Sequence, residues 1–217
     1  MPLQQLADAA WALEAAKHPG AVAMRAAVGA PFTLLPGCLA RLRLKLEDLR
    51  EEVALNRDEV HTASGKVLPE ARLTAWQSDG GHSFRYSGKT SAPPPGGLTP
   101  RVAAVRDELA RLLGVHYDSC LVNLYPDGTS GMRYHSDPQG QDWAADTAVV
   151  SIGAPRRFVF RAVGDHATRC GIVVRSGDVV HMGPGCQERF QHAILPEASA
   201  ESAAPRISLV FKKRRGE

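Results

Sequence analysis

The chain has 217 residues, of which 44% are hydrophobic and 23% charged, and this balance is typical of a globular protein rather than of collagen, a coiled coil or a disordered chain. A formal net charge of +3 is too small to establish a polyanionic partner, and the 4 cysteines form no CxxC pair that would indicate a thiolate zinc site. Residues 1–20 lack the basic segment of a secretory signal and no apolar run approaches about 18 residues, so we expect an intracellular protein of the cytoplasm or nucleus, with no membrane segment.

The N-terminal part of the chain has helical periodicity. An alanine-rich stretch over residues 3–17 and leucines that recur at helical spacing from Leu39 onward predict two helices. We therefore interpret residues 1–54 as an N-terminal helical extension. Residues 55–98 change to polar sequence rich in glycine and proline, which predicts turns and loops.

The rest of the chain begins with a short helix and continues in strands. Thr99 can cap the helix, Pro100 suits its first turn, and Gly114 ends it. From Cys120 onward, apolar runs separated by turns predict a mainly β fold with flanking helices, an antiparallel sandwich or barrel. These runs are CLVNLY, TAVVSIG, RFVFRAV, GIVVRSGDVVHM, RFQHAIL and RISLVF.

The stretch RYHSDP places a histidine and an aspartate one residue apart, at His135 and Asp137. This pattern alone is weak evidence of a metal site, because it occurs a second time, at His116 and Asp118. The second pair follows the helix-ending Gly114 in a connection. The first pair follows a short extended segment, in which alternate side chains share one face, so both could point toward one ion.

A metal site would need a third ligand, and the candidates are His166, His181 and His192. His192 lies in a later predicted strand that a sandwich could bring close. Two imidazoles and one carboxylate leave coordination positions open and suit a non-haem Fe(II), whereas structural zinc fills four positions and prefers thiolate. Spacing alone leaves open whether RYHSDP is half of a metal site or a polar turn.

A second group of polar residues indicates an anion site. In PRISLVFKK, alternation places Arg206, Ser208 and Lys212 on one face, and CLVNLY places Asn123 and Tyr125 on one face of its own strand. An inward arginine is costly unless an acceptor such as a carboxylate meets it. An amide, a phenol and a guanidinium together would suit a small dicarboxylate. The alternative is that Arg206 pairs with a protein carboxylate and Tyr125 only packs.

These motifs coincide with a known pattern. Residues 70–213 resemble the AlkB family of Fe(II)- and 2-oxoglutarate-dependent dioxygenases, which repair alkylated nucleic acids. The matching stretches, in this order, are EARLTAWQ, FRYSG, LVNLYPDG, HSDP, VVSIGAPRRFVFR, GDVVHMG, QH and PRISLVFKK.

The resemblance implies a double-stranded β-helix, or jelly roll, over residues 99–217, with a substrate-recognition lid over residues 55–98. It implies oxidative removal of N-methyl lesions such as 1-methyladenine and 3-methylcytosine from DNA or RNA, with release of formaldehyde, succinate and CO2. It assigns Fe(II), as the catalytic centre, to His135, Asp137 and His192. It assigns 2-oxoglutarate, the co-substrate used with O2, to Asn123, Tyr125, Arg206, Ser208 and Lys212.

Two positions depart from the family pattern. The closing motif usually reads Arg-x-Asn-x-Thr-x-Arg, but here Ser208, Val210 and Lys212 follow Arg206, and a lysine keeps the charge while losing the planar fork of arginine. Gln139 stands where family members often have an acidic residue near the target base. Substrate choice is therefore less constrained by the sequence than the chemistry.

Four residues are predicted to contact the substrate: Tyr86, Trp76, Gln139 and Arg161. The resemblance makes Tyr86 the aromatic that stacks on a flipped base, although aromatic residues in a β-rich segment can equally belong to the core. We expect a monomer whose partner is methylated nucleic acid. Two alternatives stay open: the same iron chemistry on methylated protein side chains or a small molecule, and an inactive nucleic-acid-binding module.

Overall fold

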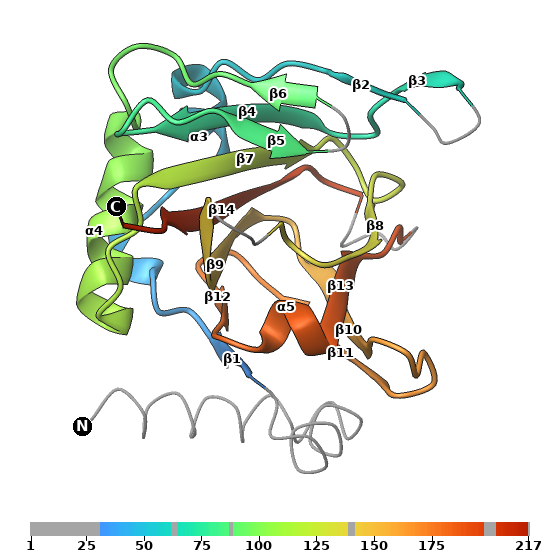
Figure 1. Cartoon of the computed structure of the whole chain (residues 1–217). Coiled ribbons are helices and arrows are strands. Elements are labelled where there is room, and N and C mark those ends of the chain that lie inside the picture. Colours follow the sequence, from blue (N-terminus) through green and yellow to red (C-terminus); the bar gives the residue numbers. More distant parts are fainter. Residues whose placement is uncertain (1–30, 62–64, 87–88, 139–141, 198–202, 217) are drawn as a thin grey trace.

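The computed structural model describes residues 31–61, 65–86, 89–138, 142–197 and 203–216. The helix predicted over residues 3–17 and the candidate Gln139 lie outside the described residues. Figure 1 shows two antiparallel sheets, with helices α3 and α4 beside the larger one. None of the described helices is long and apolar enough to cross a membrane.

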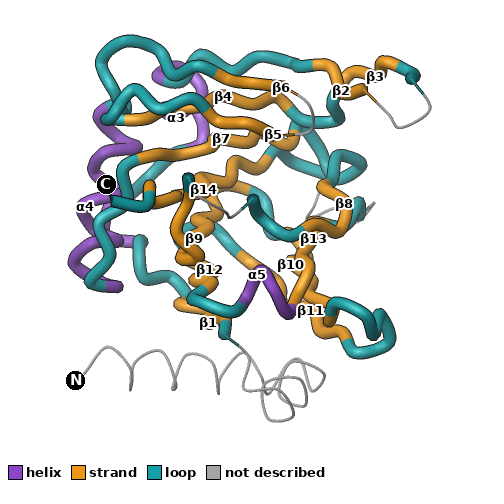
Figure 2. Tube along the Cα trace, in the orientation of Figure 1, coloured by secondary structure: helices purple, strands orange, loops and turns teal. Residues whose placement is uncertain are grey.

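The large sheet has six strands, all paired antiparallel. In spatial order they are β1 (Phe32–Leu35), β12 (Val179–Met182), β9 (Trp143–Gly153), β14 (Arg206–Arg214), β7 (Ser119–Tyr125) and β4 (Leu73–Ser78). One face packs on α3 (Leu46–Glu52) and α4 (Pro100–Leu113), which lie together on the side away from the small sheet (Figure 2).

The small sheet has four strands and faces the other side of the large sheet. In spatial order they are β11 (Arg169–Val174), β10 (Arg156–Ala162), β13 (Phe190–Ile194) and β8 (Met132–His135), and the short helix α5 (Cys186–Arg189) leads into β13. Apolar residues of both sheets form one buried cluster, with Val149 from the large sheet and Phe158 and Phe160 from the small one. The predicted mainly β fold, with helices flanking a jelly-roll core, is confirmed.

Two hairpins lie near strand β4 of the large sheet in Figure 1. They are formed by β2 (Glu59–His61) with β3 (Val67–Pro69), and by β5 (Phe84–Tyr86) with β6 (Lys89–Ser91). Both belong to the predicted lid, over residues 55–98. The division of the chain at residues 54 and 98 stays a prediction, and the large sheet includes strands from all three parts, since β1 pairs with β12 and β4 with β7.

Strand alternation in β14 explains how one segment serves both a core and a site. Ile207, Leu209 and Phe211 are buried in the cluster under the helices. Arg206 and Ser208 face the opposite way, toward the space between the sheets. This is the two-residue period expected of a strand that is covered on both faces.

One predicted helix has the expected bounds, and another begins later than the sequence predicted. Helix α4 has the expected bounds, and Gly114 ends it at φ 69°, a left-handed conformation that glycine adopts without strain. The Thr99 side chain makes no capping bond, because its hydroxyl lies against the Gln77 side chain instead. The helix expected from Leu39 begins only at Leu46, since a short 3-10 turn ends in a left-handed Arg43 at φ 49°.

Candidate metal centre and dicarboxylate pocket

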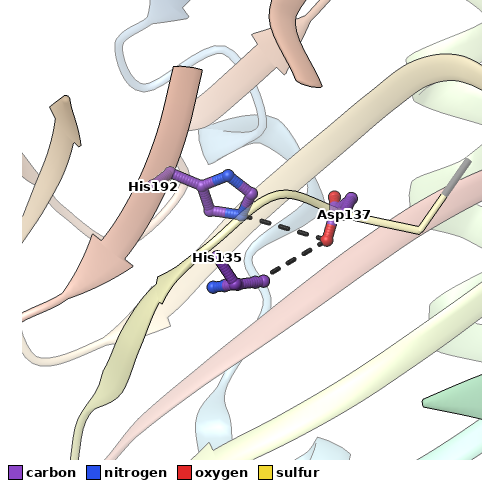
Figure 3. A group of neighbouring side chains, drawn as sticks. All are labelled: His135, Asp137 and His192. Carbon is purple, nitrogen blue, oxygen red and sulfur yellow. Dashed lines mark ion pairs between the residues drawn. The ribbon is translucent and has the colours of Figure 1, made fainter. Parts of the chain in front are cut away.

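Three side chains converge between the sheets, as Figure 3 shows: His135 at the end of β8, Asp137 two residues later and His192 in β13. Their ligand atoms all lie within 4.8 Å of one another. The Oδ1 atom of Asp137 is 3.7 Å from Nε2 of His135 and 3.9 Å from Nε2 of His192. Two nitrogens and one oxygen around an open space fit a non-haem iron that must leave coordination positions free. The three metal ligands implied by the resemblance are thus brought together.

The competing histidines lie elsewhere. His181 is bonded to Asp146, with its Nε2 3.0 Å from both carboxylate oxygens, on the helix-covered side of the large sheet. Neither His116 nor His166 belongs to a cluster of potential ligands among the described residues. The geometry therefore favours RYHSDP over the second His-x-Asp pair.

A β-bulge aims His135 at the centre. His135 pairs with His192, but the next pair in the register is Met132 with Ile194, so Arg133 and Tyr134 of β8 lie opposite a single residue of β13. Because side chains alternate along a regular strand, residues three apart would face opposite ways. The extra residue turns both Met132 and His135 inward, where they line the same cavity.

The histidine protonation states suit metal binding. The Nδ1 atom of His135 lies 2.8 Å from the carbonyl oxygen of Arg133, so Nδ1–H donates to that carbonyl and Nε2 keeps its lone pair. Burial lowers the pKa of His192 to about 3. The His192 ring is therefore neutral at neutral pH, which is the form that ligates a metal.

Asp137 is held from two sides. Its backbone N–H donates to Oε1 of Gln187 at 2.8 Å, and the Lys212 ammonium lies 3.2 Å from its Oδ2. Burial alone would raise the pKa of Asp137, but the Lys212 ammonium and the two histidines hold it well below its ordinary value. Lys212 was predicted to bind 2-oxoglutarate. In the structure it is not among the residues that line the cavity, and its ammonium forms an ion pair with Oδ2 of Asp137.

The cavity beside the metal centre ends at Arg206, whose side chain is fully buried. One terminal nitrogen donates to Oγ of Ser151 at 2.9 Å, while Nε and the other terminal nitrogen have no partner. No carboxylate of the described residues pairs with this guanidinium, which argues against the alternative that Arg206 pairs with a protein carboxylate. The Tyr125 ring lies 5.2 Å from its Cζ. A buried and unpaired arginine requires an anion, because an isolated buried charge is costly.

The middle of the cavity carries neutral polar groups. The Nδ2 atom of Asn123 donates to Oγ of Ser208 at 3.4 Å, and Oδ1 of Asn123 accepts from Nε of Arg72 at 2.9 Å. Asn123, Tyr125, Arg206 and Ser208 therefore line one cavity with the metal centre, as the strand alternation predicted.

Sequence reasoning missed three contributors: Arg72, Ser151 and Gln187. Arg72 directly precedes strand β4 and turns its guanidinium into the cavity, where it also contacts Sδ of Met132 at 2.9 Å. Its signal was an arginine at the edge of an apolar run, which usually indicates an exposed strand end. Ser151 and Gln187 gave no signal, because each acts through a contact between distant segments.

The predicted substrate residues fall into different places. Tyr86 lines the cavity, half-buried, with its ring centroid 6.5 Å from that of His135. Trp76 does not line it; the indole is buried, donates to the carbonyl of His82 at 2.7 Å and packs edge-on against Trp143. Arg161 also lies away from the cavity, because His192 and Phe160 occupy the inward positions of these strands and Arg161 the outward one.

Comparisons with known proteins agree with this geometry. A family model described as the 2OG-Fe(II) oxygenase superfamily matches residues 32–212. A mimivirus protein, the uncharacterized protein R406 of Acanthamoeba polyphaga mimivirus, is 35% identical over 70% of this chain and 78% of its own length. The solved structure of OsALKBH1 superposes with a TM-score of 0.61 at 13% identity, covering 85% of this chain and 98% of that one, which shows a shared fold.

Two relatives with named activities are less identical to this chain than the mimivirus protein, and this chain covers a smaller share of their lengths. The DNA oxidative demethylase ALKBH2 of Mus musculus is 32% identical over 69% of this chain, and the alpha-ketoglutarate-dependent dioxygenase alkB homolog 3 of Bos taurus is 29% identical over 66%. This chain spans 64% and 51% of their lengths, respectively.

The chain therefore belongs to the 2OG-Fe(II) oxygenase superfamily. Within that superfamily it is an AlkB-family dioxygenase, whose cofactors are Fe(II), 2-oxoglutarate and O2.

Proposed function

We propose that this dioxygenase removes N-methyl groups from bases of DNA or RNA, with lesions of the 1-methyladenine and 3-methylcytosine type as substrates. The observation that carries the proposal is one cavity that joins three elements: a His-Asp-His cluster, an unpaired buried arginine and an aromatic ring at the mouth. Support for a nucleic-acid substrate comes from the relative named a DNA oxidative demethylase.

The metal would be held by His135, Asp137 and His192. Fe(II), when bound, supplies oxidation by O2 coupled to the conversion of 2-oxoglutarate to succinate and CO2. The protein contributes a fixed geometry: the bulge orients one imidazole, and Lys212 engages one oxygen of Asp137 so that the other faces both histidines.

The co-substrate would lie along the cavity between the metal and Arg206. Arg206 would receive the distal carboxylate, and its two unpartnered nitrogens supply the donors for this contact. Tyr125 would assist at the same end. The amide of Asn123 and the hydroxyl of Ser208 lie between the two ends and would orient the rest of the molecule.

The methylated base would enter beside Tyr86. Its ring is tilted at 71° to that of His135, and the two bound the space where a planar base could be held near the metal. Hydroxylation of the N-methyl carbon gives a hemiaminal, which releases formaldehyde and leaves the unmodified base. Gln139 and Arg161 stay predicted substrate contacts, but the buried position of Trp76 gives no support to its predicted role.

The test is turnover on a substrate panel. Protein prepared without oxygen is supplied with Fe(II), 2-oxoglutarate and methylated single-stranded DNA, duplex DNA, RNA or histone peptide, and then with air. We expect formaldehyde, succinate and mass loss from a nucleic acid, all abolished by Asp137→Ala. Mass loss from the peptide alone would move the assignment to protein substrates. Absence of any turnover would indicate an inactive binding module.

A further inference from the structure

A row of basic side chains crosses the outer face of the small sheet. Cys170 and Phe160 point into the core, so their neighbours Arg169 and Arg161 point outward. These two arginines are directly opposite in the strand register. Like charges in that position destabilise a strand pair. Among the described residues, neither guanidinium has a carboxylate partner, so the fold keeps an unneutralised pair there.

The row continues toward β8 through an aromatic ring. The Cζ atom of Arg161 lies 4.0 Å from the centroid of Tyr134, and its Nε donates to Oε1 of Gln191 at 2.8 Å. These contacts fix the guanidinium over the Tyr134 ring without neutralising it. Arg133, which is exposed, shares the bulge with Tyr134. The result is a basic row defined by Arg133, Arg161 and Arg169.

The basic row lies directly behind the metal centre. Tyr134 precedes His135 and Gln191 precedes His192, so the outer face carries the residues that alternate with both metal ligands. Strand β8 is the edge of the small sheet. A polymer whose base enters the cavity past this edge would place its backbone over β8, with neighbouring linkages above Tyr134 and Arg161.

We propose that the basic row binds the sugar-phosphate backbone next to the methylated base. This inference rests on the proposed function and extends it from the base to the flanking chain. Arginine suits the role because its planar fork matches phosphate oxygens in two-point contacts. Because the basic row crosses the strands, it would orient the bound sugar-phosphate backbone from the edge strand β8 toward β11.

The test is salt-dependent binding of a short single-stranded oligonucleotide with one 1-methyladenine. Protein carrying Mn(II) and 2-oxoglutarate without O2 is titrated by fluorescence anisotropy over a range of salt concentrations. For Arg161→Gln/Arg169→Gln we expect about 10-fold weaker binding at low salt and a log–log salt slope reduced by about 1.4, because each single-strand phosphate contact contributes about 0.7. Lys45→Gln/Arg50→Gln removes two exposed charges from the region of α3 and should leave both quantities unchanged.

Two further measurements separate backbone binding from folding and from catalysis. Arg169→Gln alone removes an exposed side chain that makes no hydrogen bond or ion pair among the described residues, and it should reduce the slope by about 0.7. Turnover of 1-methyladenosine monophosphate, which is too short to span the row, should be equal in Arg169→Gln and in the wild-type protein. Unchanged oligonucleotide affinity and slope in the double variant would overturn this proposal alone. Wild-type protein that binds no oligonucleotide would overturn it together with the proposed nucleic-acid function.

Discussion

Arg206 shows at the scale of one residue why the site expects an anionic ligand. Its side chain is fully buried, and the described residues satisfy only part of its donors. Burial lowers the pKa of this guanidinium, which is the effect of removing a charge from water without a counter-ion. The sequence predicted an inward arginine from alternation in PRISLVFKK, but only the folded chain shows that no protein carboxylate meets it.

We expect Arg206→Met to lose 2-oxoglutarate binding while keeping its fold. Affinity should fall by about 2–5 kcal/mol, the usual cost of removing one partner of a buried charge pair. The free energy of unfolding without ligand should change little, because a buried unpaired charge is replaced by apolar volume. Calorimetric titration with 2-oxoglutarate and Mn(II), together with urea unfolding, measures both quantities. Strong destabilisation with unchanged affinity would show instead that Arg206 is structural.

The low pKa of His192 predicts a pH dependence of stability in the metal-free protein. The folded chain keeps this ring neutral down to about pH 3, whereas the ring in the unfolded chain is protonated below about 6.5. The unfolded state therefore binds more protons in this window, and stability falls as the pH falls. Between pH 7 and pH 5, wild-type protein in chelator should lose about 2 kcal/mol more than His192→Gln in urea unfolding. Equal losses would mean that the ring is protonated in the folded state.

The bulge in β8 is the element that makes the metal centre possible. A regular strand would match residue for residue with β13 and turn either Met132 or His135 away from the cavity. The sequence indicated an extended segment at GMRYH, but a bulge depends on the partner strand and leaves no local signal. By contrast, helix α4 was predictable with its bounds, because proline at its start and glycine at its end act locally.

Deleting Arg133 should remove the bulge and abolish metal binding. The expected loss of Ni(II) affinity is at least about 100-fold, the upper part of the range for disturbed orienting contacts, because His135 would face the outer surface. Calorimetric titration measures the affinity, and circular dichroism checks that the strands remain. Arg133→Gly, which keeps the residue count and the backbone carbonyl that accepts from His135, is the matched control and should bind Ni(II) normally. Normal binding by the deletion variant would contradict the role given to the bulge.

At the scale of the whole molecule, the site connects the two sheets. Arg206, Asn123 and Ser208 belong to the large sheet, whereas His135 and His192 belong to the small one. A metal together with 2-oxoglutarate would therefore contact both layers around the shared core. Ligands that bind only the folded state stabilise it in proportion to the logarithm of their concentration.

Mn(II) and 2-oxoglutarate together should raise the thermal unfolding midpoint. At 100 times the dissociation constant the gain is about 2.7 kcal/mol, which corresponds to roughly 5–10 °C for a chain of this size. Differential scanning calorimetry without O2 measures the shift. With Arg206→Met, Mn(II) should still stabilise but 2-oxoglutarate should add nothing. An equal contribution from 2-oxoglutarate in that variant would place its binding site elsewhere.

The sequence by itself determined which residue types carry the chemistry and in which order they occur. Strand runs, helix ends and alternation are local properties, so they predicted the mainly β fold, helix α4 and the shared face of Asn123 and Tyr125. Only the tertiary structure decided which candidates meet. In the folded chain Trp76 is buried in the core, Lys212 pairs with Asp137, and the Arg72 side chain lies in the cavity. These outcomes depend on register and on contacts between distant segments, and no local pattern specifies either.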